Sequence, residues 1–146
     1  MEIRPYHTSD DGALLQLLRK NIPRYFAPSE EADFVEYLAH HAAHYFVVTE
    51  HDRIIGAGGY NYAADGEVRI SWDFIDPARQ GRGIGRKLLA YRLDQIKKDP
   101  AVKEVVVRTS QLAWQFYERS GFTLEYSKKD YWAPGFDLYY MKRPIA

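Results

Sequence analysis

Eight consecutive residues near the middle of the chain have the composition of an anion-binding turn. They read Gln80-Gly81-Arg82-Gly83-Ile84-Gly85-Arg86-Lys87. From Arg79 to Lys98 the chain carries seven Lys or Arg residues and one acid, Asp94. Glycines let the backbone approach a ligand closely, and the first N–H groups of a helix have no partner within it. A helix start also carries positive potential. The stretch therefore predicts a site for a phosphate or pyrophosphate.

The elements around these glycines can position such a site. An extended segment, Val68–Asp76, precedes them and is closed by Pro77. Apolar residues follow at helical spacing, namely Ile84, Leu88, Leu89, Leu93 and Ile96. This periodicity is typical of an amphipathic helix. We therefore predict a strand, a tight turn and a helix in that order.

Two familiar phosphate motifs do not fit the glycine spacing, because a P-loop needs G-x-x-x-x-G-K-[ST] and a dinucleotide-binding turn needs G-x-G-x-x-G. The observed pattern is Gln-x-x-Gly-x-Gly, at Gln80, Gly83 and Gly85. It resembles the pyrophosphate loop of the GNAT superfamily, the acyl-CoA-dependent N-acyltransferases. Ala113–Phe122, about thirty residues further on, resembles the family's A-x-x-F-Y-x-x-x-G-F signature.

The resemblance implies that acetyl-CoA is the co-substrate and lies along the fourth strand. The N–H of Ile75 would stabilise the oxyanion, and backbone amides of residues 81–86 would bind the pyrophosphate. Cofactor contacts are thereby expected at Phe74, Ile75, Gln80, Gly81, Arg82, Gly83, Ile84, Gly85, Arg86, Lys87, Ser110 and Phe116. Ser110 stands where the family often has asparagine.

The resemblance also indicates catalytic residues. Tyr117 is the candidate general acid for the leaving thiolate, and its alternative is a place in the core. Many family members carry an acid where this chain has Arg69, so the base is expected at Asp73 or Glu67. Strand alternation predicts that Glu67, Arg69, Ser71 and Asp73 share one face. The alternative for both carboxylates is a solvated surface or a charge pair with Arg69.

An aromatic wall is expected to bind the acceptor, a small-molecule or peptide amine. Its members are Tyr25, Phe26, Trp72, Tyr131 and Trp132. Such a wall suits an apolar or cationic amine, and its alternative is ordinary packing. His40 and His44 are spaced i, i+4, but no third ligand is evident, so no metal is expected.

Three functions remain open at this point. The first is an N-acetyltransferase that works by direct attack of a primary amine in a ternary complex. The second is a non-catalytic acyl-CoA-binding or regulatory module, which Arg69 favours and Tyr117 disfavours. The third is an enzyme that uses another acyl group or an aminoacyl-tRNA acceptor.

Composition limits the class of protein. The 146 residues suffice for one domain, and 46% are hydrophobic. Zero net charge argues against a nucleic-acid partner, and the absence of cysteine excludes disulfides and thiolate catalysis. No apolar run suits a membrane span and Met1–Arg4 is not a signal peptide, so we expect a cytoplasmic monomer or homodimer.

The pattern predicts one α/β domain with a mixed sheet of six to seven strands and about four helices. Strands are expected at Glu2–Tyr6, Tyr45–Glu50, Arg53–Tyr62, Glu67–Asp76, Val102–Arg108, Phe122–Lys128 and Asp137–Lys142. Asp130–Gly135 is expected to link the last two. Helices are expected before Pro23, from a Ser29 cap to His40, from the glycine turn to Lys98, and around Tyr117 with Ser110 as cap. The glycines at 56, 58 and 59 predict a bulge or close backbone contact.

Overall fold

The computed structural model describes residues 1–145. The chain divides into two compact units. Unit 1 comprises Met1–Asn61 and Ser71–Arg92, and unit 2 comprises Tyr62–Ile70 and the chain from Leu93 onwards.

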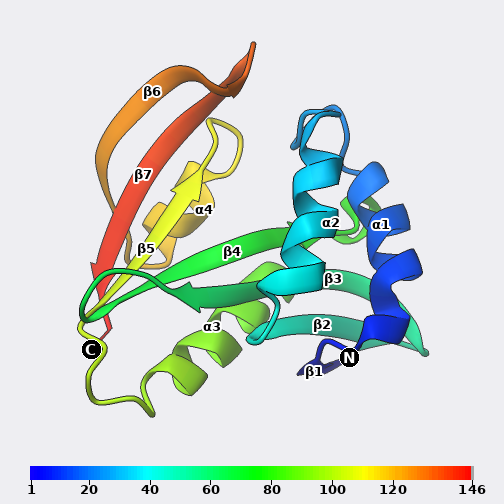
Figure 1. The fold of residues 1–146 in the computed structure, drawn as a ribbon, viewed down its shortest axis with the longest axis horizontal. Helices are drawn as coiled ribbons and strands as arrows, with labels where there is room; N and C mark the ends of the chain where they lie inside the picture. Colours follow the sequence, from blue (N-terminus) through cyan, green and yellow to red (C-terminus); the bar gives the residue numbers. More distant parts are fainter. Residues whose placement is uncertain (146) are drawn as a thin grey trace. The chain divides into compact units, whose positions relative to one another are not determined.

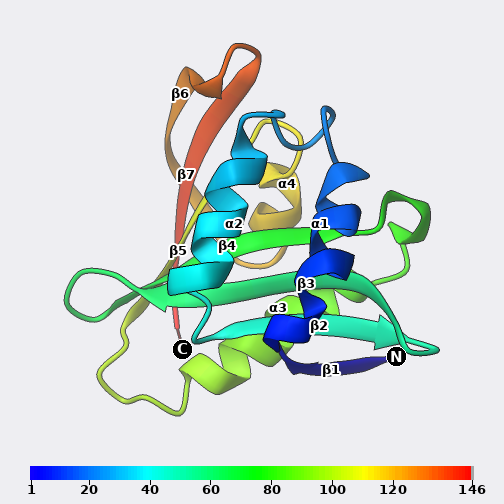
Figure 2. The same cartoon turned by 45° about the vertical axis from the view of Figure 1, so that its right-hand side comes forward.

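Helices and strands are interspersed along the chain, as Figures 1 and 2 show. The α-helices are α1 (Asp11–Arg19), α2 (Glu30–His40), α3 (Ile84–Ile96) and α4 (Trp114–Arg119). The strands are β1 (Glu2–Pro5), β2 (Tyr45–Glu50), β3 (Arg53–Tyr62), β4 (Glu67–Ile75), β5 (Glu104–Thr109), β6 (Thr123–Ala133) and β7 (Phe136–Pro144). Two short 3-10 helices are η1 (Thr8–Asp10) and η2 (Pro77–Arg79).

All seven strands belong to one mixed sheet, in the order β1-β2-β3-β4-β5-β7-β6. The pair β4–β5 is parallel, whereas β1–β2, β2–β3, β5–β7 and β6–β7 are antiparallel. The predicted α/β fold with a mixed sheet and four helices is confirmed. No helix in the described part of the chain is long and apolar enough to cross a membrane.

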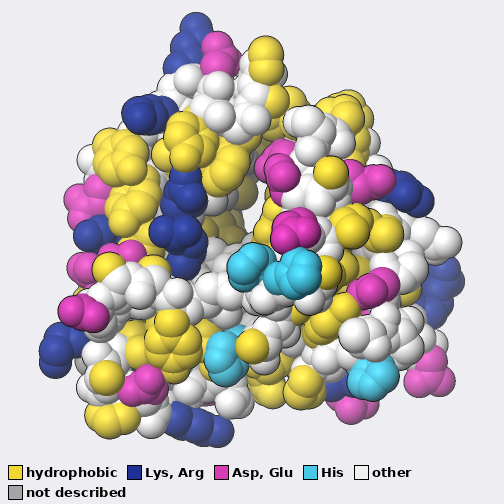
Figure 3. Space-filling view, in the orientation of Figure 1, with side chains coloured by type: hydrophobic (Ala, Val, Ile, Leu, Met, Phe, Trp, Pro, Cys, Tyr) yellow, Lys and Arg dark blue, Asp and Glu magenta, His cyan; other side chains and the backbone are white. Residues whose placement is uncertain are grey.

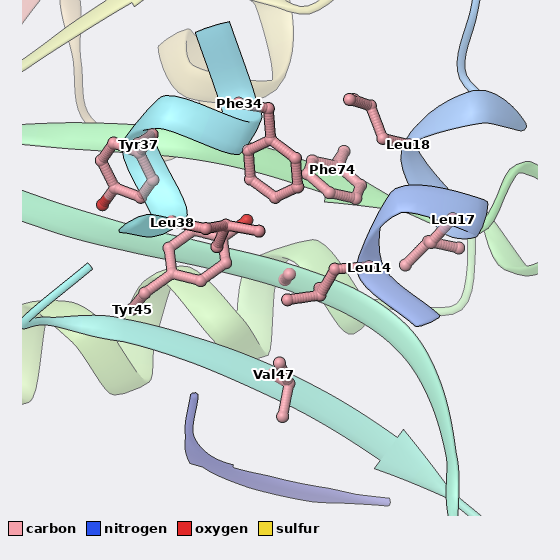
Figure 4. Packing of buried hydrophobic residues seen from close by; sticks show 10 residues of the cluster. Leu14, Leu17, Leu18, Phe34, Tyr37, Leu38, Tyr45, Val47 and Phe74 are labelled. Carbon is pink, nitrogen blue, oxygen red and sulfur yellow. The ribbon is translucent and has the colours of Figure 1, made fainter. Parts of the chain in front are cut away.

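In unit 1, helices α1 and α2 cover one face of the strands and α3 covers the other (Figures 1 and 2). The core between the two helices and the strands is apolar, because each element directs one hydrophobic face inward. Figure 4 shows Leu14, Leu17, Leu18, Phe34, Tyr37, Leu38, Tyr45, Val47 and Phe74 converging there. Burial of one such side chain contributes about 1.5–3 kcal/mol.

The glycines of β3 allow close backbone contacts, as predicted. A Cβ at Gly58 would lie 2.7 Å from Nη1 of Arg92 and 2.9 Å from Oδ1 of Asp73. A Cβ at Gly59 would lie 2.4 Å from the carbonyl oxygen of His44. These positions therefore leave room for a buried arginine on one side and the neighbouring backbone on the other.

Unit 2 contains β5, β7 and β6 with the short helix α4. β5 pairs with β7 from Glu104↔Pro144 to Thr109↔Tyr139. The link predicted at Asp130–Gly135 is wrong, because β6 continues to Ala133 and leaves only Pro134 and Gly135 between the strands. Asp130 closes this longer hairpin by accepting from the Gly135 N–H at 2.7 Å and donating its own N–H to Asp137 Oδ1 at 2.9 Å.

The start of α2 uses a different cap from the one predicted. Ser29 occupies the N-cap position but makes no side-chain hydrogen bond there. Instead, Glu30 Oε2 accepts from the Ala27 N–H at 2.7 Å. The carboxylate of Glu30 thus fixes the turn that precedes the helix, and the first-turn N–H groups receive no bond from the Ser29 side chain.

Candidate active site

The glycine-rich turn of unit 1 has the backbone geometry of an anion cradle. Gly81 and Gly83 have φ values of 81° and 77°, in the left-handed region that favours glycine. Helix α3 then begins at Ile84, and the Lys87 N–H donates to the Gly83 carbonyl at 3.1 Å. The N–H groups of residues 84–86 consequently have no acceptor within the helix.

Space for a ligand lies beside these amides. A Cβ built at Gly81 meets nothing within 4 Å, and one at Gly83 meets only Nη2 of Arg86, at 3.6 Å. Arg82, Arg86 and Lys87 are exposed around the turn. The residues present therefore fit a pyrophosphate, which the backbone N–H groups would bind and the three exposed cationic side chains would neutralise.

Contacts from other segments of unit 1 hold the turn in place. The Tyr25 hydroxyl donates to Oε1 of Gln80 at 3.1 Å. Arg79 forms an ion pair and hydrogen bond with Glu50 at the end of β2. Tyr25, predicted to line the acceptor site, thus contacts the first residue of the glycine motif.

The end of β4 departs from regular strand geometry. Trp72 has φ of +47°, and its carbonyl accepts from the Tyr45 hydroxyl at 2.8 Å. Before it, Ser71 Oγ donates to Asn61 Oδ1 at 2.6 Å. The hydroxyl of Tyr37, on α2, donates to the same oxygen. After it, Asp73 pairs with Arg92 of α3. The prediction that Ser71 and Asp73 share a face is therefore wrong, because the left-handed residue between them interrupts the alternation.

Arg92 and Asp73 form the most buried ion pair in the described part of the chain. Their atoms Nη2 and Oδ2 lie 2.7 Å apart, and the side chains are 0% and 10% exposed. Arg92 also donates to the carbonyl oxygens of Gly59 at 3.1 Å and Leu88 at 3.3 Å. Arg92 is thus an ion-pair partner of Asp73, and the Asp73 carboxylate compensates a guanidinium removed from water.

Aromatic rings gather around Trp72 in unit 1. Phe26 stacks on Trp72 with ring centroids 5.7 Å apart, and Phe34 lies 5.0 Å away. Phe26 also meets Phe74 edge-on at 5.9 Å. Two predicted acceptor residues, Phe26 and Trp72, are therefore in direct contact and partly exposed beside the buried Phe74.

The hydroxyls of Tyr37 and Tyr45, whose rings belong to the same cluster, are hydrogen-bond donors that stay protonated. Burial raises the pKa of Tyr37 to about 12, against the opposing effects of its hydrogen-bonding neighbour Ser71 and of Arg92. Burial also raises the pKa of Tyr45 well above its ordinary value. Both phenols therefore stay neutral near pH 7 and act as hydrogen-bond donors rather than as bases.

Unit 2 carries the candidate general acid. Tyr117 is 4% exposed, and its ring contacts those of Phe116 at 5.0 Å and Phe122 at 5.6 Å. The N-cap of α4 is Ala113 rather than the predicted Ser110. Ser110 instead shapes the preceding turn, where its carbonyl accepts from the N–H groups of Ala113 and Trp114.

Tyr131 and Trp132 lie on β6, and their rings make cation–π contacts with the guanidinium of Arg108. The guanidinium carbon of Arg108 lies 5.2 Å from the Tyr131 ring centroid and 5.3 Å from that of Trp132. The Trp132 Nε1–H donates to the Thr109 carbonyl at 3.3 Å. These contacts join the predicted acceptor residues of unit 2 to the end of β5.

Glu67 opens β4 and faces Glu104 in the parallel ladder of unit 2. That ladder ends at Ile70↔Val107, although β4 continues to Ile75. Among the described residues there is no group of three or more His, Asp or Glu side chains arranged to hold a metal. Nε2 of His40 lies instead 3.7 Å from Oε1 of Glu36, which is on the same helix.

Sequence reasoning missed Arg92, Asn61 and Arg108. Arg92 occupies the apolar face of α3, four residues after Leu88 and four before Ile96, and that placement was a usable signal. The sequence offered no such signal for Asn61 or Arg108, because their contacts come from segments distant along the chain.

Comparison with family models matches residues 15–143 to the acetyltransferase (GNAT) domain. Comparison with curated proteins finds no match. A solved GNAT-family structure from Desulfovibrio desulfuricans is 24% identical, with TM-score 0.81 and coverage of 99% of both chains. The Escherichia coli ribosomal-protein-S18-alanine N-acetyltransferase is 20% identical, with TM-score 0.81 and coverage of 99% of this chain and 94% of that one. An aminoglycoside 6'-N-acetyltransferase complexed with coenzyme A is 14% identical, with TM-score 0.82 and coverage of 100% and 98%.

Proposed function

Because the chain belongs to the GNAT family of acetyltransferases, we propose that it transfers an acetyl group from acetyl-CoA to a primary amine. The amine attacks the thioester directly, within a ternary complex. The observation that carries this proposal is the glycine turn at the start of α3, with left-handed Gly81 and Gly83 and open space beside them. The absence of cysteine is consistent with direct transfer rather than an acyl-cysteine intermediate.

The pyrophosphate of acetyl-CoA is assigned to the amides of residues 81–86, with Arg82, Arg86 and Lys87 adding charge. The pantetheine and thioester are assigned to Phe74 and Ile75, with Ser110 and Phe116 as further contacts. The end of the parallel ladder at Ile70 supports this assignment, because β4 runs beyond it and its later N–H groups are candidates for the oxyanion.

Tyr117 is proposed as the general acid that protonates the leaving thiolate of CoA. A phenol has a pKa of about 10 and a thiol of about 8.5, so the proton transfer is close to balanced. The two aromatic neighbours of Tyr117 fix the orientation of its ring. A fixed ring supports the role because general-acid catalysis depends on a held geometry.

The base is proposed at Asp73 or Glu67, both on β4. The ion pair with Arg92 weighs against Asp73, since protonating this carboxylate would leave a fully buried guanidinium without its counter-charge. The same pair is the observation that favours the second candidate function, an acyl-CoA-binding module without transfer activity. Thiol release from acetyl-CoA with a panel of amines distinguishes the two functions.

The cofactor assignment is tested by Gly83→Val. A branched side chain strains the left-handed backbone and fills the open space, so acetyl-CoA binding measured by calorimetry should be lost. Circular dichroism establishes that the variant is folded, and Gly12→Val is the control, because Gly12 has open space around it outside the turn. Wild-type affinity in folded Gly83→Val would remove the basis for the assignment.

A further inference from the structure

The best-organised charged group in unit 2 outside the proposed cofactor contacts is the Arg108 cluster, which comprises Arg108, Tyr131 and Trp132. The guanidinium of Arg108 lies over both rings and donates to the Tyr131 hydroxyl. Lys128 Nζ lies 5.9 Å from the Tyr131 ring and adds a second positive charge. The cluster is therefore strongly cationic and fixed by aromatic contacts.

Arg108 has donor capacity left for a ligand. A guanidinium offers five N–H donors in a planar fork, and the Tyr131 hydroxyl takes one of them. Among residues 1–145, no carboxylate lies within ion-pair distance of Arg108, although its side chain is only partly exposed. In Figure 3, Lys and Arg side chains lie among apolar ones over β5 and β7.

The cluster is joined to the segment that carries the predicted CoA contact Ser110. Trp132 donates to Thr109, and Gln111 binds the hairpin through the Gly135 carbonyl at 2.6 Å and the Asp137 N–H at 2.9 Å. This segment leads directly into α4, which bears Tyr117. The Arg108 cluster is consequently tied to the segment that precedes the proposed general acid.

From these contacts we infer that the acceptor is a small amine that also carries a carboxylate, such as an α- or ω-amino acid, and that Arg108 binds that carboxylate. This inference rests on the proposed function. A cationic amine would meet like charge at Tyr131 and Trp132, since their ring faces already hold Arg108. A carboxylate instead gains two charge-assisted hydrogen bonds from the fork, and the rings exclude water around it.

The test uses the full chain, acetyl-CoA and matched acceptor pairs. Each amino acid, from glycine and γ-aminobutyrate to aromatic ones, is compared with its own carboxamide at equal concentrations of neutral amine. We expect kcat/KM to favour the carboxylate member in the wild type. In Arg108→Gln that preference should fall by about 10–100-fold, the effect of losing a hydrogen bond to a charged group.

Two further variants make the result specific. Arg108→Lys keeps the charge without the fork and should restore part of the preference. Arg119→Gln removes an exposed charge from α4 and should change the preference by less than about twofold, since solvent screens it. Circular dichroism and tryptophan fluorescence report whether each variant keeps its fold.

The outcomes separate this inference from the function on which it rests. Carboxamides acetylated as well as carboxylates, or a preference unchanged in Arg108→Gln, would overturn the inference and leave the acetyltransferase proposal standing. Acetyl-CoA binding without acetylation of any amino acid would also refute it. Failure of acetyl-CoA to bind in calorimetry would instead refute the proposed function itself.

Discussion

Breaking the buried pair of Arg92 and Asp73 from one side should be one of the most destabilising single changes in unit 1. The side chains are 0% and 10% exposed, and Arg92 makes two further bonds to backbone carbonyls. Arg92→Met keeps much of the volume but leaves the carboxylate uncompensated. Breaking such a pair from one side costs about 3–5 kcal/mol, a large part of the roughly 5–15 kcal/mol that stabilises a typical domain.

Urea unfolding of a double-mutant cycle measures this effect. Arg92→Met and Asp73→Leu should each lower the free energy of unfolding by about 3–5 kcal/mol. The double variant should lose less than the sum, with a coupling of about 1–3 kcal/mol, because neither charge is then left alone. Additive losses, or single losses below about 1 kcal/mol, would refute the reasoning.

The same positions decide whether Asp73 is also a base. Asp73→Asn should remove the acidic limb of the pH–rate profile if the carboxylate takes the proton from the amine. Arg92→Met is the matched control, because it disturbs the same pair and leaves the carboxylate in place. Equal kinetic effects in the two variants would assign Asp73 a positioning role and leave Glu67 as the candidate, tested by Glu67→Gln.

Two further predictions concern a catalytic and a stabilising contact. Tyr117→Phe should lower turnover by about 10²–10⁴-fold with little change in acetyl-CoA affinity, whereas an equal loss of both would indicate that Tyr117 only positions CoA. The hydrogen bond from Arg4 holds the pKa of Asp10 below its ordinary value, so the stability it contributes is present at neutral pH and lost as the pH falls below about 4. Arg4→Met should lower the free energy of unfolding at pH 7 and flatten that acid loss; parallel pH profiles for the two proteins would contradict this.

Local patterns made much of the fold predictable. The glycine turn and α3 are encoded by neighbouring residues, from Gln80 to Ile96, and β2 and β3 have the predicted bounds. The glycines of β3 also gave the close contacts expected of them. These features depend on residue type and short spacing, which a single sequence displays.

Other features depend on partners far along the chain. Nothing local to Trp72 indicates a left-handed residue, because a bulky side chain rarely adopts that conformation without support from elsewhere. The support comes from the Tyr45 hydroxyl and the packing of Phe26 and Phe34. The partner of Asp73 and the length of the β6–β7 hairpin were likewise set by contacts that alternation and turn rules do not describe.

The left-handed conformation of Trp72 also affects how the length of this chain can vary. A regular strand directs alternate residues to opposite layers, so the extra residue at 72 is what sends Asp73 towards α3 and Phe74 towards α2. If the strand became regular with the same number of residues, the layers of everything after residue 72 would be exchanged, and a phenylalanine would be directed at a buried guanidinium. We therefore expect natural one-residue insertions in relatives to avoid Ser71–Ile75 and to collect in turns such as Ala63–Gly66, where no layer depends on the count.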